Sequence, residues 1–157
     1  MNNAIESHLR RLQPKTKLKI GTIFAHESYA GLMEGLPHEF YGFQGQNIKT
    51  WNYGLRPVPK NAFILNKPFP PMPRVELDLF LSGDKFSSFQ LLGNIAHQLN
   101  VPHIFQANHL PPLGISKIQS AELKAMKANR HVYVGRASKE AWEDSDPNNP
   151  VIYYGLD

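Results

Sequence analysis

The stretch DLFLSGDKFSSFQLLGNIAHQLNVPHIFQ, residues 78–106, decides the fold. Its first part, 78–82, is apolar inside without alternation, which predicts a buried strand. Asn100 stands where a left-handed helix end is favoured, and 103–106 predicts the next strand. The segment between the two strands carries apolar residues at three- and four-residue steps, which predicts a helix with one core-facing side: Phe86, Phe89, Leu92, Ala96 and Leu99.

A strand, a helix and a strand at this spacing predict parallel pairing through a right-handed crossover. The same alternation continues on both sides of the stretch. Further strands are expected at 18–24, 38–43, 61–66, 131–135 and 151–154, with 61–66 as a short edge strand. Further helices are expected at 29–36, 116–128 and 138–143, the first capped by Ser28 and the second by a capping box of Ser116 and Gln119.

We therefore predict an α/β fold with a doubly wound, mostly parallel Rossmann-like sheet and helices on both faces. This domain covers 18–157 and follows an amino-terminal arm at 1–17, where Ile5, Leu9 and Leu12 have helical spacing. The loop 44–60 and the proline-rich segment 67–74 interrupt the regular elements.

The composition indicates a globular protein. Of 157 residues, 41% are hydrophobic and none is cysteine, which excludes disulfides and thiolate metal sites and fits a reducing compartment. There is no secretory signal and no apolar run long enough for a membrane helix, so a soluble, cytoplasmic protein is expected. The net charge of +4 comes from scattered basic residues and is typical of a solvated surface, not of a nucleic-acid groove.

In parallel sheets ligands bind beyond the carboxyl ends of the strands, and this rule selects the candidate residues. His26, Glu27 and Ser28 follow the first strand. Their side chains and backbone amides are suited to hydrogen-bonding sugar hydroxyls or an anion. The alternative is a helix cap with solvated neighbours, and the sequence leaves both open.

Two further groups follow later strands. Ser82-Gly83-Asp84 comes after 78–82, and Asp84 is either a general base for an acceptor hydroxyl or an N-cap. Asn108-His109 follows the next strand, and His109 is either a base that titrates near neutrality or a structural residue.

Other histidines and aromatic residues have structural interpretations. His97 and His103 are predicted to be structural, the first on a helix and the second at a strand start. Phe43, Trp51 and Tyr53 either stack on a sugar ring or base or cover the sheet edge.

Familiar cofactor motifs are missing from the sequence. It contains no G-x-G-x-x-G, no Walker loop, no G-x-S-x-G and no H-E-x-x-H, so neither a dinucleotide site nor a metal site is predicted.

Taken in order, six segments resemble the amino-terminal, acceptor-side domain of GT-B fold glycosyltransferases, of the phage and bacterial retaining type. These are the first strand with its loop at 19–29, the second strand at 38–41, the strand 78–82, the run 100–111, the strand and helix at 131–142 and the last segment at 151–157. The resemblance implies transfer of a sugar from a nucleotide-sugar substrate to an acceptor hydroxyl, without a metal or other cofactor. It implies catalytic roles for Asp84 and His109, and substrate binding by His26, Glu27, Ser28, Ser82, Gly83 and Asn108.

The family's second domain, which binds the donor and carries an E-x7-E motif, has no counterpart in 1–157. We therefore expect half of a split or truncated enzyme, with a second chain carrying the donor domain or a homo-oligomer as partner, and a glycan or other hydroxyl compound as acceptor. The alternative is a non-catalytic module that binds a glycan, a nucleotide or a protein. A nucleic-acid-associated protein is the third alternative, for which binding would fall steeply with salt.

Overall fold

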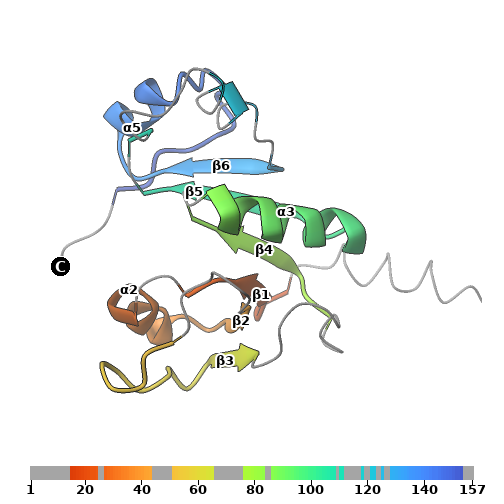
Figure 1. Ribbon diagram of the computed structural model, residues 1–157, viewed down its shortest axis with the longest axis vertical. Coiled ribbons are helices and arrows are strands. Elements are labelled where there is room, and N and C mark those ends of the chain that lie inside the picture. Colours follow the sequence, from red (N-terminus) through yellow and green to blue (C-terminus); the bar gives the residue numbers. More distant parts are fainter. Residues whose placement is uncertain are drawn as a thin grey trace, which may run out of the picture. The chain divides into compact units, whose positions relative to one another are not determined.

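The computed structural model describes residues 15–24, 27–43, 51–65, 76–83, 86–108, 110–111, 118, 121–122, 125 and 128–153. Its strands form one six-stranded parallel sheet in the order β3-β2-β1-β4-β5-β6 (Figure 1). This confirms the predicted α/β Rossmann-like fold. The strands are β1 (Lys19–Thr22), β2 (Glu39–Phe43), β3 (Ala62–Leu65), β4 (Leu79–Ser82), β5 (His103–Ala107) and β6 (Arg130–Tyr133).

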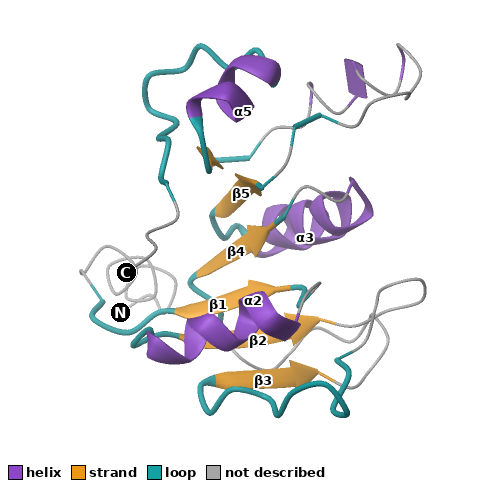
Figure 2. Ribbon diagram, turned by 90° about the vertical axis from the view of Figure 1, so that its left-hand side faces the viewer, coloured by secondary structure: helices purple, strands orange, loops and turns teal. Residues whose placement is uncertain are grey.

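The chain divides into two compact units, Met1–Asp78 and Leu79–Asp157, which we call the first and second unit. In the first unit, β1 pairs in parallel with β2, and β2 with β3. Helix α2 (Glu27–Leu32) and the 3₁₀ turn η1 (Met33–Gly35) connect β1 to β2. Figure 2 shows the three strands side by side, with β3 at the edge as the sequence predicts.

The segment 51–61 makes the return to β3 without a helix and is held to the end of η1 by one side chain. The Asn61 amide Nδ2 donates to the carbonyl oxygens of Met33, Leu36 and His38 at 2.9, 3.1 and 3.0 Å. The Met33 carbonyl also accepts the Leu36 N–H, so Asn61 adds a second donor there and supplies donors to the Leu36 and His38 carbonyls beyond the helix end. The amide therefore fixes where η1 ends and where β2 begins.

Phe24 is the centre of the core of the first unit. Its ring lies directly over Gly42 of β2, because a Cβ added at Gly42 would lie 2.3 Å from Phe24 Cδ2. The Trp51 ring meets Phe24 edge to face at 5.5 Å, and Trp51 Nε1 donates to the Arg56 carbonyl. The loop containing Trp51 thus closes the core over β1 and β2.

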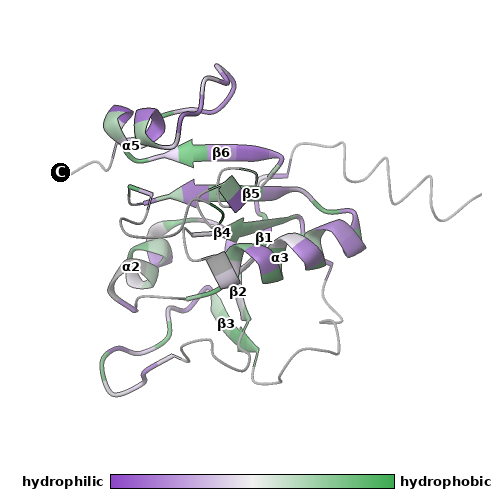
Figure 3. Ribbon diagram, turned by 45° about the horizontal axis from the view of Figure 1, so that its top comes forward, coloured by the Kyte–Doolittle hydropathy of each residue, from purple (hydrophilic) through white to green (hydrophobic). Residues whose placement is uncertain are grey.

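In the second unit, β5 pairs in parallel with β4 and with β6, and helix α3 (Phe86–Leu99) packs on β4 and β5. Green and purple segments alternate along α3 in Figure 3, as expected of an amphipathic helix. Leu92 and Ala96 of the predicted apolar stripe are buried. Asn100 has a φ of 51°, which confirms the predicted left-handed helix end.

Phe105 of β5 is the centre of the core of the second unit. Phe89 of α3 and Trp142, which follows α5 (Arg136–Ala141), both meet its ring edge to face, at 5.3 and 5.6 Å. Phe105 is 1% exposed, and burying such a side chain contributes about 2–3 kcal/mol. Burial alternates along β4 and β5, so Leu79 and Leu81 are half-buried although the sequence of β4 does not alternate.

Several expected boundaries differ in the structure. Helix α2 begins at Glu27, which places Ser28 in the first turn of the helix and not at its N-cap. Helix α5 begins two residues earlier than the expected 138. Of the strand expected at 151–154, Val151 forms a single parallel bridge with Tyr133, Ile152 and Tyr153 are outside any strand, and Tyr154 lies outside the described ranges.

Some expectations fall on residues outside the described ranges. These are the helix in the arm at 1–17, the proline segment 67–74 and the capping box of Ser116 and Gln119. Within the helix expected at 116–128, the described residues Ile118, Ala121, Glu122 and Ala125 are helical.

Candidate functional site

Two predicted site residues lie side by side at the carboxyl ends of β4 and β5. Gly83 directly follows β4 and Asn108 directly follows β5. A Cβ added at Gly83 would lie 3.8 Å from Asn108 Nδ2, a normal van der Waals contact. The missing side chain of Gly83 therefore leaves room beside the Asn108 amide. Asp84 and His109, the next residue after each, lie outside the described ranges.

Ser82, the last residue of β4, faces the interior of the second unit. It is 1% exposed, and its hydroxyl makes a 2.8 Å hydrogen bond with Nε2 of His103. The hydroxyl thus has a partner within the fold, and substrate binding by Ser82 stays a prediction.

His103 is buried, and its protonation state follows from that position. Burial, together with the smaller effect of the nearby His131, lowers the pKa of the imidazole from 6.5 to about 4. The ring is therefore neutral at physiological pH and does not serve as a charged ligand group.

The predicted group after β1 is only partly described. Glu27 is 5% exposed, and its Oε1 accepts the backbone N–H of Asn52 at 3.1 Å. The carboxylate therefore fixes the loop that begins at Trp51. Ser28 lies in α2 but its side chain is not described, and His26 lies outside the described ranges.

The three aromatic residues around this loop differ in exposure. Phe43 of β2 and Trp51 are buried, so their rings are packed inside the first unit and are not exposed to a ligand. Tyr53 is 64% exposed and remains accessible to a ligand.

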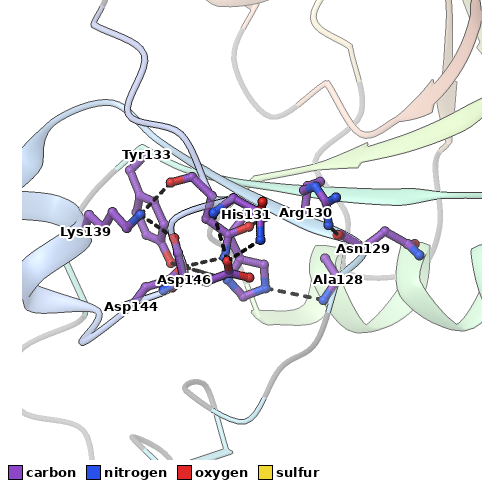
Figure 4. A network of polar contacts seen from close by, with 10 residues as sticks. Ala128, Asn129, Arg130, His131, Tyr133, Lys139, Asp144 and Asp146 are labelled. Atoms are coloured by element: carbon purple, nitrogen blue, oxygen red, sulfur yellow. Dashed lines mark hydrogen bonds and ion pairs between the residues drawn. The ribbon is translucent and has the colours of Figure 1, made fainter.

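The sequence interpretation missed a polar network that joins β6 to the segment 144–149 (Figure 4). The Tyr133 hydroxyl donates to Asp144 Oδ2 at 2.6 Å, and Asn149 Nδ2 donates to the same oxygen at 2.8 Å. His131 Nδ1 lies 3.3 Å from the Tyr133 hydroxyl and 3.8 Å from Asp144 Oδ2. Alternation in the strand puts His131 and Tyr133 on one face, but nothing local to either residue indicates a partner eleven or more positions away.

These contacts shift the protonation equilibria within the network. Burial raises the pKa of Tyr133, and the hydrogen bond to Asp144 adds to the increase. Hydrogen bonds from Tyr133, from the backbone of Asp146 and from Asn149 hold the pKa of Asp144 below its usual value, although burial opposes them. Burial lowers the pKa of His131. The network therefore holds a neutral tyrosine against a carboxylate.

Lys139 of α5 closes the network from the other side. Its Nζ donates to the carbonyl oxygens of Asp146 and Asn149 at 2.7 and 2.6 Å. The polar groups of the network are paired with one another, so their evident effect is to hold the segment 144–149 on β6.

Across the described ranges, no group of three or more histidine, aspartate, glutamate or cysteine residues is placed to hold a metal ion. Within the same ranges, no helix has the length and apolar character to cross a bilayer. The fold and the edge at Gly83 and Asn108 define the class as an α/β protein with a parallel, Rossmann-like sheet. No protein-family model, curated protein or solved structure gave a significant match to the chain.

Proposed function

We propose that the chain is a glycosyltransferase-like domain that binds a sugar ligand at the carboxyl ends of β4 and β5. The adjacency of Gly83 and Asn108 carries this proposal. Ligands of parallel sheets bind beyond the carboxyl ends of the strands. An asparagine amide can both donate hydrogen bonds to sugar hydroxyls and accept hydrogen bonds from them. Gly83 supports the proposal because it leaves room for a hydroxyl to approach that amide.

The chemical step of this proposal uses the two residues that come next in the sequence. Asp84 is the general base that removes the proton of an acceptor hydroxyl, and His109 orients the ligand or shares that role. The sugar comes from a nucleotide-sugar substrate, and the reaction uses no metal.

The second candidate function is binding without catalysis. It is favoured by Ser82 and Glu27, whose polar groups have partners within the fold and are used to hold it together. A domain of this kind would bind a glycan, a nucleotide or a protein at the edge formed by Gly83 and Asn108.

The binding edge is tested by a titration of the chain with nucleotide-sugars and oligosaccharides, followed by calorimetry and amide NMR shifts. We expect Gly83→Leu and Asn108→Ala to weaken binding at least about tenfold, which is about 1.4 kcal/mol. Gly35→Leu is the matched control, because a Cβ at Gly35 meets nothing within 4 Å. Unchanged affinity in both variants would exclude this edge.

The two candidate functions are separated by Asp84→Asn and His109→Ala. Sugar transfer is assayed with the chain alone and together with candidate donor-domain chains. Transfer that is lost in these variants while binding persists supports the enzyme. Binding without transfer in every combination supports the non-catalytic module.

A further inference from the structure

The second unit has a hollow of about 450 Å³ beside the amino-terminal end of β5. It lies next to the last turns of α3 and to Ala128 and Asn129, which precede β6. Its volume is within the usual range for small-molecule sites. The Gly83 and Asn108 edge is at the opposite ends of β4 and β5, so this hollow is separate from the proposed sugar site.

One ring nitrogen in the wall of the hollow has no partner among the described residues. His103 is 4% exposed; its backbone N–H donates to Asn129 Oδ1 and its Nε2 pairs with the Ser82 hydroxyl, both at 2.8 Å. Its Nδ1 makes no hydrogen bond within that part of the chain. Asn61 Oδ1, and not Nδ1 of His103, is the fully buried side-chain atom without a partner among the described residues, so Nδ1 is open to the hollow and available to a ligand there.

Gly93 leaves the edge of this ring uncovered. It lies in the middle of α3, and a Cβ added there would lie 3.4 Å from both Nδ1 and Cε1 of His103. Glycine inside a helix costs about 1 kcal/mol relative to alanine. Both Gly93 and His103 line the hollow, so the absent side chain keeps Nδ1 accessible from it.

The walls determine which ligand fits. Ala96, Val101, Pro102 and Ala128 form an apolar part of the wall, against which a flat ring can pack, and His97, Asn100, His103 and Asn129 form the polar part. The carboxyl end of α3 carries the negative end of the helix dipole, which disfavours anions. His103 is neutral at physiological pH. Asn129 supplies a polar group beside His103.

We propose that this hollow binds a small, neutral, planar heterocycle of nucleobase type, which hydrogen-bonds to Nδ1 of His103. The aromatic ring of the ligand lies against the apolar part of the wall. One of its ring nitrogens or exocyclic groups forms a hydrogen bond with Nδ1 of His103. The Ser82 hydroxyl sets the tautomer: it either donates to Nε2, which makes Nδ1 a donor, or accepts from Nε2, which makes Nδ1 an acceptor.

The direct test is long-range ¹⁵N NMR of the histidine rings in the full 157-residue chain. Adenine, uracil, adenosine and uridine are the probes, and methyl glucoside is the comparison compound. We expect at least one of the four heterocycles to shift the Nδ1 resonance of His103, and methyl glucoside to leave it unchanged. No shift with any heterocycle at millimolar concentration, or an equal shift with methyl glucoside, overturns the proposal.

The variant test uses Gly93→Ala, which adds a methyl group against the ring edge. We expect the affinity for the bound heterocycle to fall at least tenfold, with helix content unchanged by circular dichroism. Gly135→Ala is the matched control, since a Cβ there meets nothing within 4 Å. Unchanged affinity in Gly93→Ala overturns the proposal. If this variant does not fold, the ring ¹⁵N measurement on the unsubstituted chain decides alone.

Discussion

At the residue scale, single polar atoms in this protein act on segments that are distant in the sequence. The Tyr133 hydroxyl reaches Asp144, and the Asn61 amide reaches three carbonyls near the end of η1. Both contacts stabilise irregular segments, 144–149 and 51–61. Their strength depends on burial, because a half-buried group that loses its partner does not fully regain water.

Replacement of Tyr133 by phenylalanine tests the network of Figure 4. The change removes the hydroxyl that donates to Asp144 and keeps the buried ring. Because a hydrogen bond to a charged group is worth about 1.5–3 kcal/mol, we expect the free energy of unfolding to fall by that amount in urea. Tyr153→Phe is the control, since Tyr153 is 62% exposed. An equal effect in both variants would show that the network contributes nothing specific.

At the element scale, helix and loop packing depends on where side chains are missing. Gly42 lets the Phe24 ring lie on β2, and Gly93 lets α3 approach His103. In each case the glycine backbone has an ordinary conformation, so close approach and not left-handed geometry explains the residue.

Gly42→Ala tests the packing of Phe24 on β2. The added Cβ would lie 2.3 Å from the ring, so Phe24 must move and disturb its edge-to-face contact with Trp51. Overpacking of a core costs about 1–3 kcal/mol, and we expect a loss in that range by urea unfolding with tryptophan fluorescence. Gly35→Ala, with open space at its Cβ, is expected to change stability by less than about 0.5 kcal/mol. A tolerated Gly42→Ala would show that the ring does not rest on the strand.

At the scale of the whole molecule, the buried ionisable groups give the protein a definite dependence on pH. The folded pKa of His103 is about 4 against an ordinary 6.5, and that of His131 is also lowered. The unfolded chain therefore binds protons first on acidification, and stability is lost as the pH falls from about 6.5 toward 4. The pKa of Tyr41 is raised to about 12 and that of Tyr133 is raised as well, so stability also falls above about pH 10.

We expect the free energy of unfolding to be highest between about pH 7 and 9, and to fall by roughly 2 kcal/mol at pH 4.5 from His103 alone. Urea unfolding at a series of pH values measures this profile. His103→Gln is expected to flatten its acid limb, since the substituted residue no longer titrates. A flat profile between pH 7 and 4.5 in the unsubstituted chain would contradict the burial of His103.

The sequence by itself determined the parallel α/β fold, α3 with its apolar stripe, the left-handed Asn100 and the edge strand β3. These features depend on local periodicity and on the connection rules of parallel strands, which a single chain displays directly. It also placed Gly83 and Asn108 at one edge, because the ends of neighbouring parallel strands meet there. Only the tertiary structure decided the Tyr133–Asp144 network and the open Nδ1 of His103. The network and the open nitrogen depend on which side chains meet across strands and loops. A local sequence pattern indicates neither which distant residues come into contact nor how deeply they are buried.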